Sequence, residues 1–272
     1  MAAAGRADTR RMRTTPAWQL GCLLLAVAAA PAAAQAPNDQ VVELGLMSFR
    51  PSPELRLSSG ALSGSSIEEV DFVQEFGIED TSFPSFRAAV GRTHKFRLSY
   101  AKFTYEPETV IRRTFTFQGR TFTVNTPASA DIKWDLWTFG YEWDFVSLDR
   151  GYVGVVADLK YNRIEAVVDS LALRSPAATD TTAPVPTMGI TGRGYVTPTV
   201  AITGEFTGLK VGSGDFDVKF TDFDINATVI PSRRLGIGGQ VGYRSVIADY
   251  VVDEDTGDLK MQGPYFGVIA RF

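Results

Sequence analysis

The stretch that most constrains the fold is residues 132–146, with the sequence IKWDLWTFGYEWDFV. A period of two is typical of a β-strand, whose successive side chains point to opposite faces. From Trp137 to Phe145, one face of this strand carries only aromatic residues, and the other carries glycine and two carboxylates. A water-soluble sheet gains nothing by exposing five aromatic side chains, whereas a face in contact with lipid accommodates them directly. The aromatic face holds Trp137, Phe139, Tyr141, Trp143 and Phe145, opposite Gly140, Glu142 and Asp144.

The chain ends on a second alternating strand, in which the terminal Phe272 belongs to the apolar face. This ending resembles the closing strand of bacterial outer-membrane β-barrel proteins, where the terminal aromatic strand is read by the barrel-assembly machinery. The resemblance implies a barrel that closes its first strand against its last. It also implies a C-terminal assembly signal made of Tyr265, Phe266, Val268, Ala270 and Phe272.

The N-terminal residues 1–34 predict a secretory signal peptide. Arginines at positions 6, 10, 11 and 13 precede an apolar run over residues 20–30, and a small-residue site favours cleavage after Ala34. The apolar run is too short to span a bilayer as a helix. Met12 would begin a signal of more usual length, so the start at Met1 or Met12 stays open. Residues 35–272 are then expected to form one barrel domain.

Composition narrows the class of protein further. Removing the signal takes away four Arg, one Asp and the only cysteine, Cys22, which leaves 23 basic and 30 acidic residues. A mature chain without cysteine suits export through an oxidising periplasm, and the absence of a basic patch argues against a nucleic-acid partner. After Ala34 no stretch reaches 18 apolar residues, so a membrane-spanning structure would have to consist of strands closed into a barrel.

Hydrophobic alternation predicts ten strands in a transmembrane antiparallel up-and-down barrel, although eight or twelve stay open. An even number places both chain ends on the periplasmic side. The short links near residues 92, 149, 197 and 232 would then be periplasmic, and the long links 51–82, 106–131 and 169–185 would face outward. The predicted strands are residues 41–50, 83–91, 94–105, 132–146, 151–168, 186–195, 199–211, 215–230, 234–251 and 259–272.

Three segments of the outward links carry their own predictions. Residues 67–78 have the spacing of a short amphipathic helix ended by Gly77, which would plug the barrel or lie at its rim; an irregular loop packing Phe72 and Phe76 is the alternative. Residues 54–59 either continue the first strand or turn back as a short hairpin. Residues 169–184, rich in Ala, Thr and Pro, predict a loop.

The inward positions of the predicted strands carry charges of both signs. A barrel of about eight to ten strands has an interior wide enough only for side chains or one small ligand. These charges therefore either pair across the lumen and fill it or line a narrow polar conduit. The predicted lumen charge network is Glu43, Arg87, Arg97, Glu142, Asp144, Asp158, Lys160, Arg193, Glu205, Asp222, Asp224, Arg244 and Arg271.

The sequence assigns no catalytic residue. The one histidine, His94, follows a predicted periplasmic turn and has no neighbouring serine in the spacing of a hydrolase. Residues 253–257 resemble a calcium loop only faintly, because the trailing glutamate is absent. We therefore expect no metal and no cofactor.

The outward positions of the predicted strands predict a lipid-facing aromatic girdle. The girdle is predicted to contain Trp137, Phe139, Tyr141, Trp143, Phe145, Phe223, Tyr243 and Phe266.

Over the whole mature chain, the barrel pattern resembles the small bacterial outer-membrane barrel group, which includes OmpA-like and OmpW-like domains. The resemblance implies a monomer in the outer membrane of a Gram-negative bacterium, with lipid, lipopolysaccharide and the barrel-assembly machinery as partners. No residue motif transfers a specific activity. A structural or surface-interaction role and a narrow porin-like channel or carrier for small solutes are the two functions that the pattern leaves.

Overall fold

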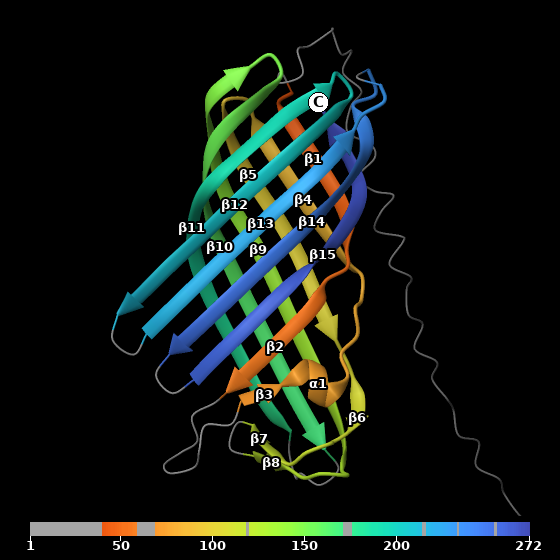
Figure 1. The fold of residues 1–272 in the computed structure, drawn as a ribbon, viewed down its shortest axis with the longest axis vertical. Coiled ribbons are helices and arrows are strands. Elements are labelled where there is room, and N and C mark those ends of the chain that lie inside the picture. The colour runs from red at the N-terminus through yellow and green to blue at the C-terminus, as the bar shows by residue number, and fades with distance from the viewer. Residues whose placement is uncertain are drawn as a thin grey trace, which may run out of the picture. The chain divides into compact units, whose positions relative to one another are not determined.

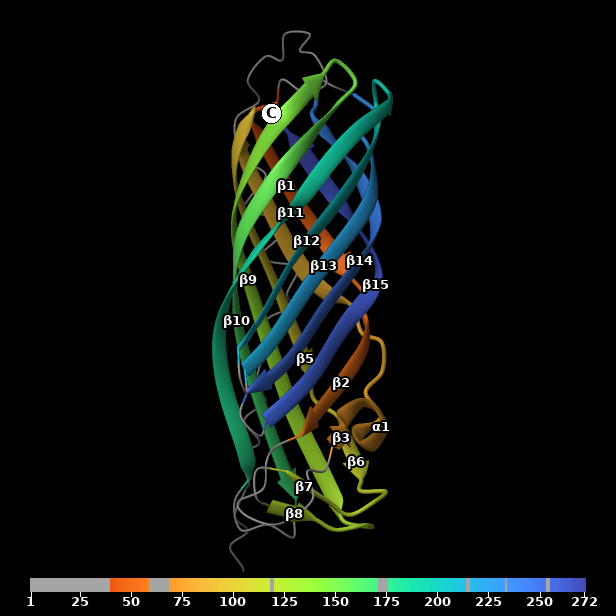
Figure 2. The ribbon, with the colours of Figure 1, turned by 60° about the vertical axis from the view of Figure 1, so that its left-hand side comes forward.

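Ten antiparallel strands close into a barrel in the computed structural model, which describes residues 40–58, 69–117, 120–170, 176–213, 216–232, 234–252 and 255–272 (Figures 1 and 2). Each strand pairs with the next in chain order, and β1 closes the ring by pairing with β15. The predicted fold class and strand number are confirmed. The barrel strands are β1 (Val42–Phe49), β4 (Phe83–Gly91), β5 (His94–Tyr105), β9 (Pro127–Leu148), β10 (Gly151–Ser170), β11 (Ala177–Thr197), β12 (Val200–Ser213), β13 (Phe216–Val229), β14 (Ile237–Val252) and β15 (Asp255–Arg271).

Both chain ends of the barrel lie at the end that carries the short turns. The N–H of Val41 donates to the carbonyl of Phe272 at 2.6 Å, and two-residue links such as Arg92–Thr93 join neighbouring strands there. In bacterial barrels this is the periplasmic end, because the longer connections are extracellular. The predicted signal peptide, residues 1–34, lies outside the described residues.

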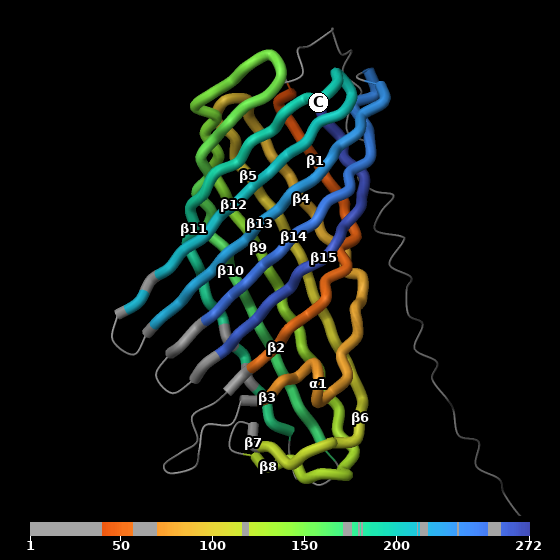
Figure 3. Tube along the Cα trace, viewed as in Figure 1, coloured from red at the N-terminus to blue at the C-terminus, as the bar shows by residue number. Residues whose placement is uncertain are grey.

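The outer end carries the remaining elements (Figure 3). One of them, β2, continues the line of β1, because β15 pairs with β1 through Tyr265–Arg271 and with β2 through Thr256–Gln262. Of the two alternatives for residues 54–59, continuation of the first strand is the one observed over residues 54–58, and Ser59 lies outside the described residues. The outer elements are β2 (Ser52–Ser58), β3 (Glu69–Asp71), α1 (Phe72–Phe76), β6 (Glu108–Val110), β7 (Phe115–Phe117) and β8 (Arg120–Phe122).

Of the predicted helix 67–78, residues 67 and 68 lie outside the described residues, and over residues 69–78 the helix α1 is shorter than predicted. Residues 69–71 pair with β2 instead, and Asp71 caps the helix by accepting the N–H of Gln74 at 3.0 Å. Gly77 ends it in the left-handed conformation, with φ 65°. The helix lies at the rim, against β2, β3 and β6. Among the described residues, no helix is long and apolar enough to cross a membrane.

The prediction of a loop over residues 169–184 is wrong for residues 169–170 and 177–184, which are strand, while residues 171–175 lie outside the described residues. Strands β10 and β11 extend through most of it and still pair as far as Val168 and Ala177. The prolines that suggested a loop lie where β11 pairs only with β10, since its pairing with β12 begins at Met188. A proline on such a free strand edge removes no ladder hydrogen bond. Pro184 and Pro186 are therefore compatible with a strand here.

Most of the long strands change the character of both their faces partway along. On β9, the inward residues are Ala and large apolar side chains from Ala128 to Leu136, and polar or charged from Thr138 to Asp144. The outward residues are polar up to Asp135 and aromatic from Trp137. The periplasmic half of the barrel thus has an apolar exterior and a charged interior. The outer half has a polar exterior and an apolar interior.

Candidate functional site in the barrel lumen

The apolar exterior forms a band of the height that a bilayer requires. Residues 137–145 of β9 extend roughly 26 Å along the strand, or about 20 Å along the axis at a tilt of about 40°, against an apolar band of about 25 Å in outer-membrane barrels. Cross-strand neighbours Tyr100 and Trp137 mark its outer edge, with ring centroids 4.4 Å apart. All eight residues of the predicted girdle lie on this exterior, from 38% exposed for Trp137 to 64% for Phe266.

His94 belongs to the periplasmic edge of the same band. Its Nδ1 lies 2.6 Å from the hydroxyl of Tyr141, and its ring stacks on Trp143 at 6.3 Å. The residue faces outward from β5 and is exposed, so it contacts neither the lumen nor the outer loops. This position is typical of an interfacial side chain.

The structure places all thirteen residues of the predicted charge network on the inner face of the wall, and it brings most of them together in pairs. Nearest the periplasmic end, Glu43 accepts hydrogen bonds from Arg193 at 2.8 and 3.0 Å and from Arg271 at 2.7 Å. Arg193 also donates to the hydroxyl of Thr203 at 2.9 Å. These contacts join β1, β11, β12 and β15 across the lumen.

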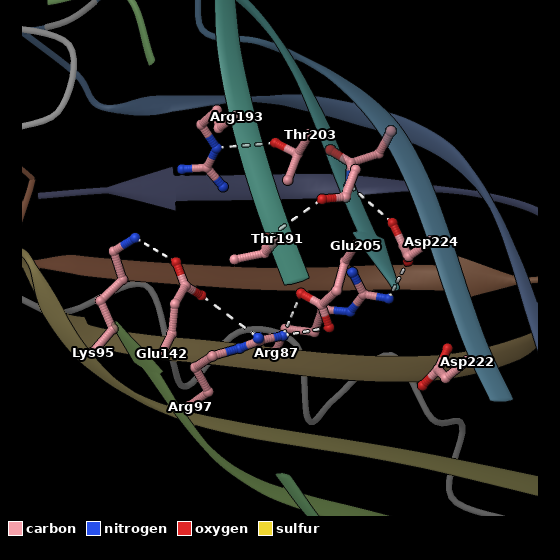
Figure 4. Close-up of polar contacts among 12 residues, drawn as sticks. Arg87, Lys95, Arg97, Glu142, Thr191, Arg193, Thr203, Glu205, Asp222 and Asp224 are labelled. Carbon is pink, nitrogen blue, oxygen red and sulfur yellow. Dashed lines mark hydrogen bonds and ion pairs between the residues drawn. The ribbon is translucent and has the colours of Figure 1, made fainter. Parts of the chain in front are cut away.

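A second group crosses the middle of the lumen (Figure 4). Arg97 donates two hydrogen bonds to Glu205, at 2.6 and 2.7 Å, and lies 3.5 Å from Glu142. Lys95 contacts Glu142 at 2.5 Å and Asp144 at 2.6 Å. Both basic residues come from β5 and reach acidic partners on β9 and β12. Buried pairs of this kind require good geometry, because desolvation offsets most of the attraction.

The innermost group lies next to the apolar half. Asp222 accepts two hydrogen bonds from Arg244, at 3.0 and 2.8 Å, and one from Lys160. Asp224 accepts from Arg87 at 2.6 Å. Within the described residues, Asp158 makes neither an ion pair nor a side-chain hydrogen bond, and its Oδ1 lies against the backbone of Gly140.

Several polar residues of this network were not predicted. Lys95 was recoverable from the sequence, since it shares the inward face of its strand with Arg97. Tyr265 was counted only with the C-terminal assembly signal, but it points inward and donates to Asp224 at 2.8 Å. Tyr152 lies between two cations, with Lys95 Nζ 3.6 Å from its ring centroid. Its position near a turn gave no signal of that contact.

The remaining assembly-signal residues face outward, as the alternation implied. Phe266 and Val268 are exposed at 64% and 57%, and Phe272 at 40%, while Ala270 is half-buried. They continue the apolar exterior to the last residue of the chain. Their proposed use as a signal is a matter of recognition by other proteins and stays a prediction.

The charged half of the lumen encloses a cavity of about 260 Å³. Its lining begins at the periplasmic mouth with Gln40, Arg92 and Ser147, and it ends inward at the level of Asp222 and Arg244. The cavity therefore extends from the periplasmic mouth through the charged half of the barrel.

Beyond the cavity, apolar side chains pack across the interior; we call this group the apolar plug. Phe103 is at its centre, with ring centroids 5.3 Å from both Phe83 and Trp134 and 6.1 Å from Phe49. Each of its members is at most 6% exposed. The plug consists of Met47, Phe49, Phe83, Phe103, Trp134, Leu136, Phe220, Val246 and Met261.

Comparisons with known proteins agree with this architecture. No family model matches the chain, and no curated protein does. Among solved structures, the outer-membrane protease OmpT of Escherichia coli is similar with a TM-score of 0.53 and 7% identity, over 86% of this chain and 97% of that one. The translocator domain of the autotransporter NalP of Neisseria meningitidis gives a TM-score of 0.45 and 12% identity, over 86% and 90% of the two chains. The attachment invasion locus protein Ail of Yersinia pestis gives 0.37 and 10%, over 84% and 99%.

At these identities the likeness to OmpT shows a shared fold and nothing about activity. Together with the apolar exterior and the closed ring of strands, it defines the class: an integral transmembrane β-barrel. More narrowly, the chain is a small bacterial outer-membrane β-barrel protein, located in the outer membrane.

Proposed function

We propose that this protein is a sealed outer-membrane barrel with a structural or surface-interaction role. The observation that carries the proposal is the apolar plug, because a conducting lumen needs a continuous water path and these side chains pack across the interior instead. Phe103, Leu136 and Phe220 are each 2% exposed. Side chains buried to this extent have almost no surface that a water molecule can reach.

The outer half supports a role at the cell surface. It continues well beyond the apolar band, and its exterior carries ion pairs between neighbouring strands, such as Lys260 with Glu54 at 2.8 Å and Lys219 with Asp249 at 3.2 Å. Such a surface suits water rather than hydrocarbon. It would present the outer ends of the described strands to external partners, while lipid and lipopolysaccharide surround the periplasmic half.

A narrow channel for small solutes is the second candidate, and the cavity of about 260 Å³ is the observation that favours it. For solutes to pass, the plug would have to rearrange. Under the first proposal the charge network stabilises the barrel, whereas under the second it would line a conduit.

Conductance of the refolded mature chain in planar bilayers separates the two. The sealed barrel predicts no discrete current steps, even at high salt and high voltage. A variant with both Phe103→Ser and Leu136→Ser serves as the positive control, because it removes the centre of the plug. Current steps in the wild type of a size equal to those of the control would refute the sealed barrel and favour the channel.

A further inference from the structure

The cavity is a blind pocket that opens toward the periplasm. Gln40 and Arg92 line its mouth, and the plug lies beyond its inner end. At about 30 Å³ for each water molecule, its volume has room for several waters or for a small solute. What it can bind depends on which hydrogen-bonding groups its wall leaves available.

Acceptors in the wall are almost all used. Both oxygens of Glu43 accept from arginine, both oxygens of Glu205 accept from Arg97, and both oxygens of Asp222 accept from Arg244. Asp144 and Asp158 also line the cavity, and their Oδ1 atoms are buried without a hydrogen-bond partner. Within the described residues, Asp158 makes no ion pair and is the exception among these acceptors. A ligand that donates hydrogen bonds or carries positive charge therefore finds few groups to receive it.

Among the ion-paired arginines that line the cavity, Arg87 has the most exposed side chain. Its side chain is 32% exposed, compared with 21% for Arg97 and 11% each for Arg193 and Arg244. A guanidinium has five N–H donors, and within the described residues that of Arg87 makes one hydrogen bond, from Nη2 to Asp224. The ring centroid of Tyr265 lies 5.3 Å from its Cζ, within the range of a cation–π contact. Arg87 thus presents oriented, unused donors to the cavity.

We propose that this pocket binds a small anion, a phosphate or a carboxylate group, held by Arg87 and admitted from the periplasmic side. A planar guanidinium recognises such groups through paired charge-assisted hydrogen bonds. Of the two nearby acidic side chains, Glu205 is bound to Arg97, and Asp224 is bound to Arg87 itself through one N–H, which leaves the other donors of Arg87 for the anion. The site goes beyond a sealed barrel, for which the lumen has no ligand.

The test uses the mature chain refolded in detergent micelles, with inorganic phosphate as the probe. Ionic strength is held constant with chloride, because screening alone changes electrostatic stability. Phosphate is expected to bind the wild type in calorimetry and to raise its thermal midpoint. The variant R87Q/D224N removes both members of the buried pair, so that neither is left unpaired, and it should weaken phosphate binding by about tenfold or more.

Arg163→Gln is the matched control. Arg163 is half-exposed on the outer half, where it pairs with Glu165 and Asp180, far from the cavity lining. The variant should bind phosphate as the wild type does. Equal phosphate binding by R87Q/D224N and the wild type, or no binding by the wild type, would overturn the site. Neither outcome bears on the sealed barrel, which is judged by conductance.

Discussion

Leu136 and Trp137 are consecutive on β9 and lie on opposite sides of the barrel wall, Leu136 2% exposed in the plug and Trp137 38% exposed on the apolar exterior. On the outward face, the aromatic residues end at Trp137, and the next residue toward the outer end is Asp135. On the inward face, the apolar residues end at Leu136, and the next residue toward the periplasmic end is Thr138. The boundary between lipid and water outside thus lies at the same level as the boundary between plug and charge network inside.

This boundary predicts a difference between two substitutions on one face of β13. Ile225, 45% exposed, lies within the apolar band, whereas Thr221 lies on the same face beyond it. Ile225→Arg should cost about 2–4 kcal/mol in a bilayer, and Thr221→Arg about 1 kcal/mol or less. Denaturant titrations in lipid vesicles measure both. If the two substitutions cost the same stability, the apolar band would not end between Ile225 and Thr221.

The plug predicts a large loss of stability when its central side chain is removed. Phe103→Ala should lower the free energy of unfolding by about 3–5 kcal/mol, because it leaves a cavity among packed aromatics. Phe139→Ala is the comparison, since Phe139 is 52% exposed to lipid and leaves no cavity. A smaller loss for Phe103 than for Phe139 would show that the plug is loosely packed.

The close approach of Tyr265 to Gly242 allows a test of the packing around Asp224. A Cβ at this position would lie 2.5 Å from Cζ of Tyr265, the residue that hydrogen-bonds to Asp224. Gly242→Ala should therefore displace the ring and destabilise the barrel by roughly 1–3 kcal/mol. At Gly204 the added methyl group would meet nothing within 4 Å. Unfolding that is unchanged by Gly242→Ala, as expected for Gly204→Ala, would contradict the packing described.

The outer hairpin of β14 and β15 should be more stable in mild acid. Burial, followed by the neighbouring Asp249, raises the pKa of the Asp258 carboxyl above its ordinary value of 3.8. The folded state therefore disfavours the ionised form relative to the unfolded state. The resulting penalty is fully present above the raised pKa and is relieved as the pH falls through it. Hydrogen exchange in the part of the hairpin that the structure describes should slow accordingly, beyond the intrinsic pH effect.

Asp258→Asn separates this effect from others, because it removes the charge without changing the shape. It should stabilise the hairpin at neutral pH and abolish the extra protection in acid. Asp180→Asn is the control, since Asp180 lies 3.1 Å from Arg163 and loses an attraction instead. Stabilisation by both substitutions would point to a general effect of negative charge.

Alternation was enough to predict ten strands and the inward position of the charges, because period two is a direct consequence of the pleat. It did not predict the plug. Phe103, Trp134 and Phe220 are apolar residues on the inward face. If lipid surrounded the barrel along its whole length, the alternation would predict polar residues at these positions. Their position follows only once the strand is known to leave the membrane.

The other departures have local causes. Pro184 and Pro186 suggested a loop because proline usually ends a strand, and only the pairing shows that their edge is free. The helix was overestimated because residues 69–71 have a partner in β2 that lies distant in sequence. The curvature of the barrel determines which charges pair and which donors of Arg87 stay unused. The sequence of a single strand does not reveal that curvature.

The reversal of both faces within one strand also fixes alignment during assembly. Side chains alternate with a period of two, so a slip of one residue turns each of them to the other side of the wall. In an ordinary barrel strand such an error is felt only where lipid meets the exterior. On β9 it would expose Asp144 to hydrocarbon and at the same time drive Asp135 into the aromatic interior near Phe103. A shift of register is thus penalised in both halves of the strand, which favours a single pairing register as the barrel forms.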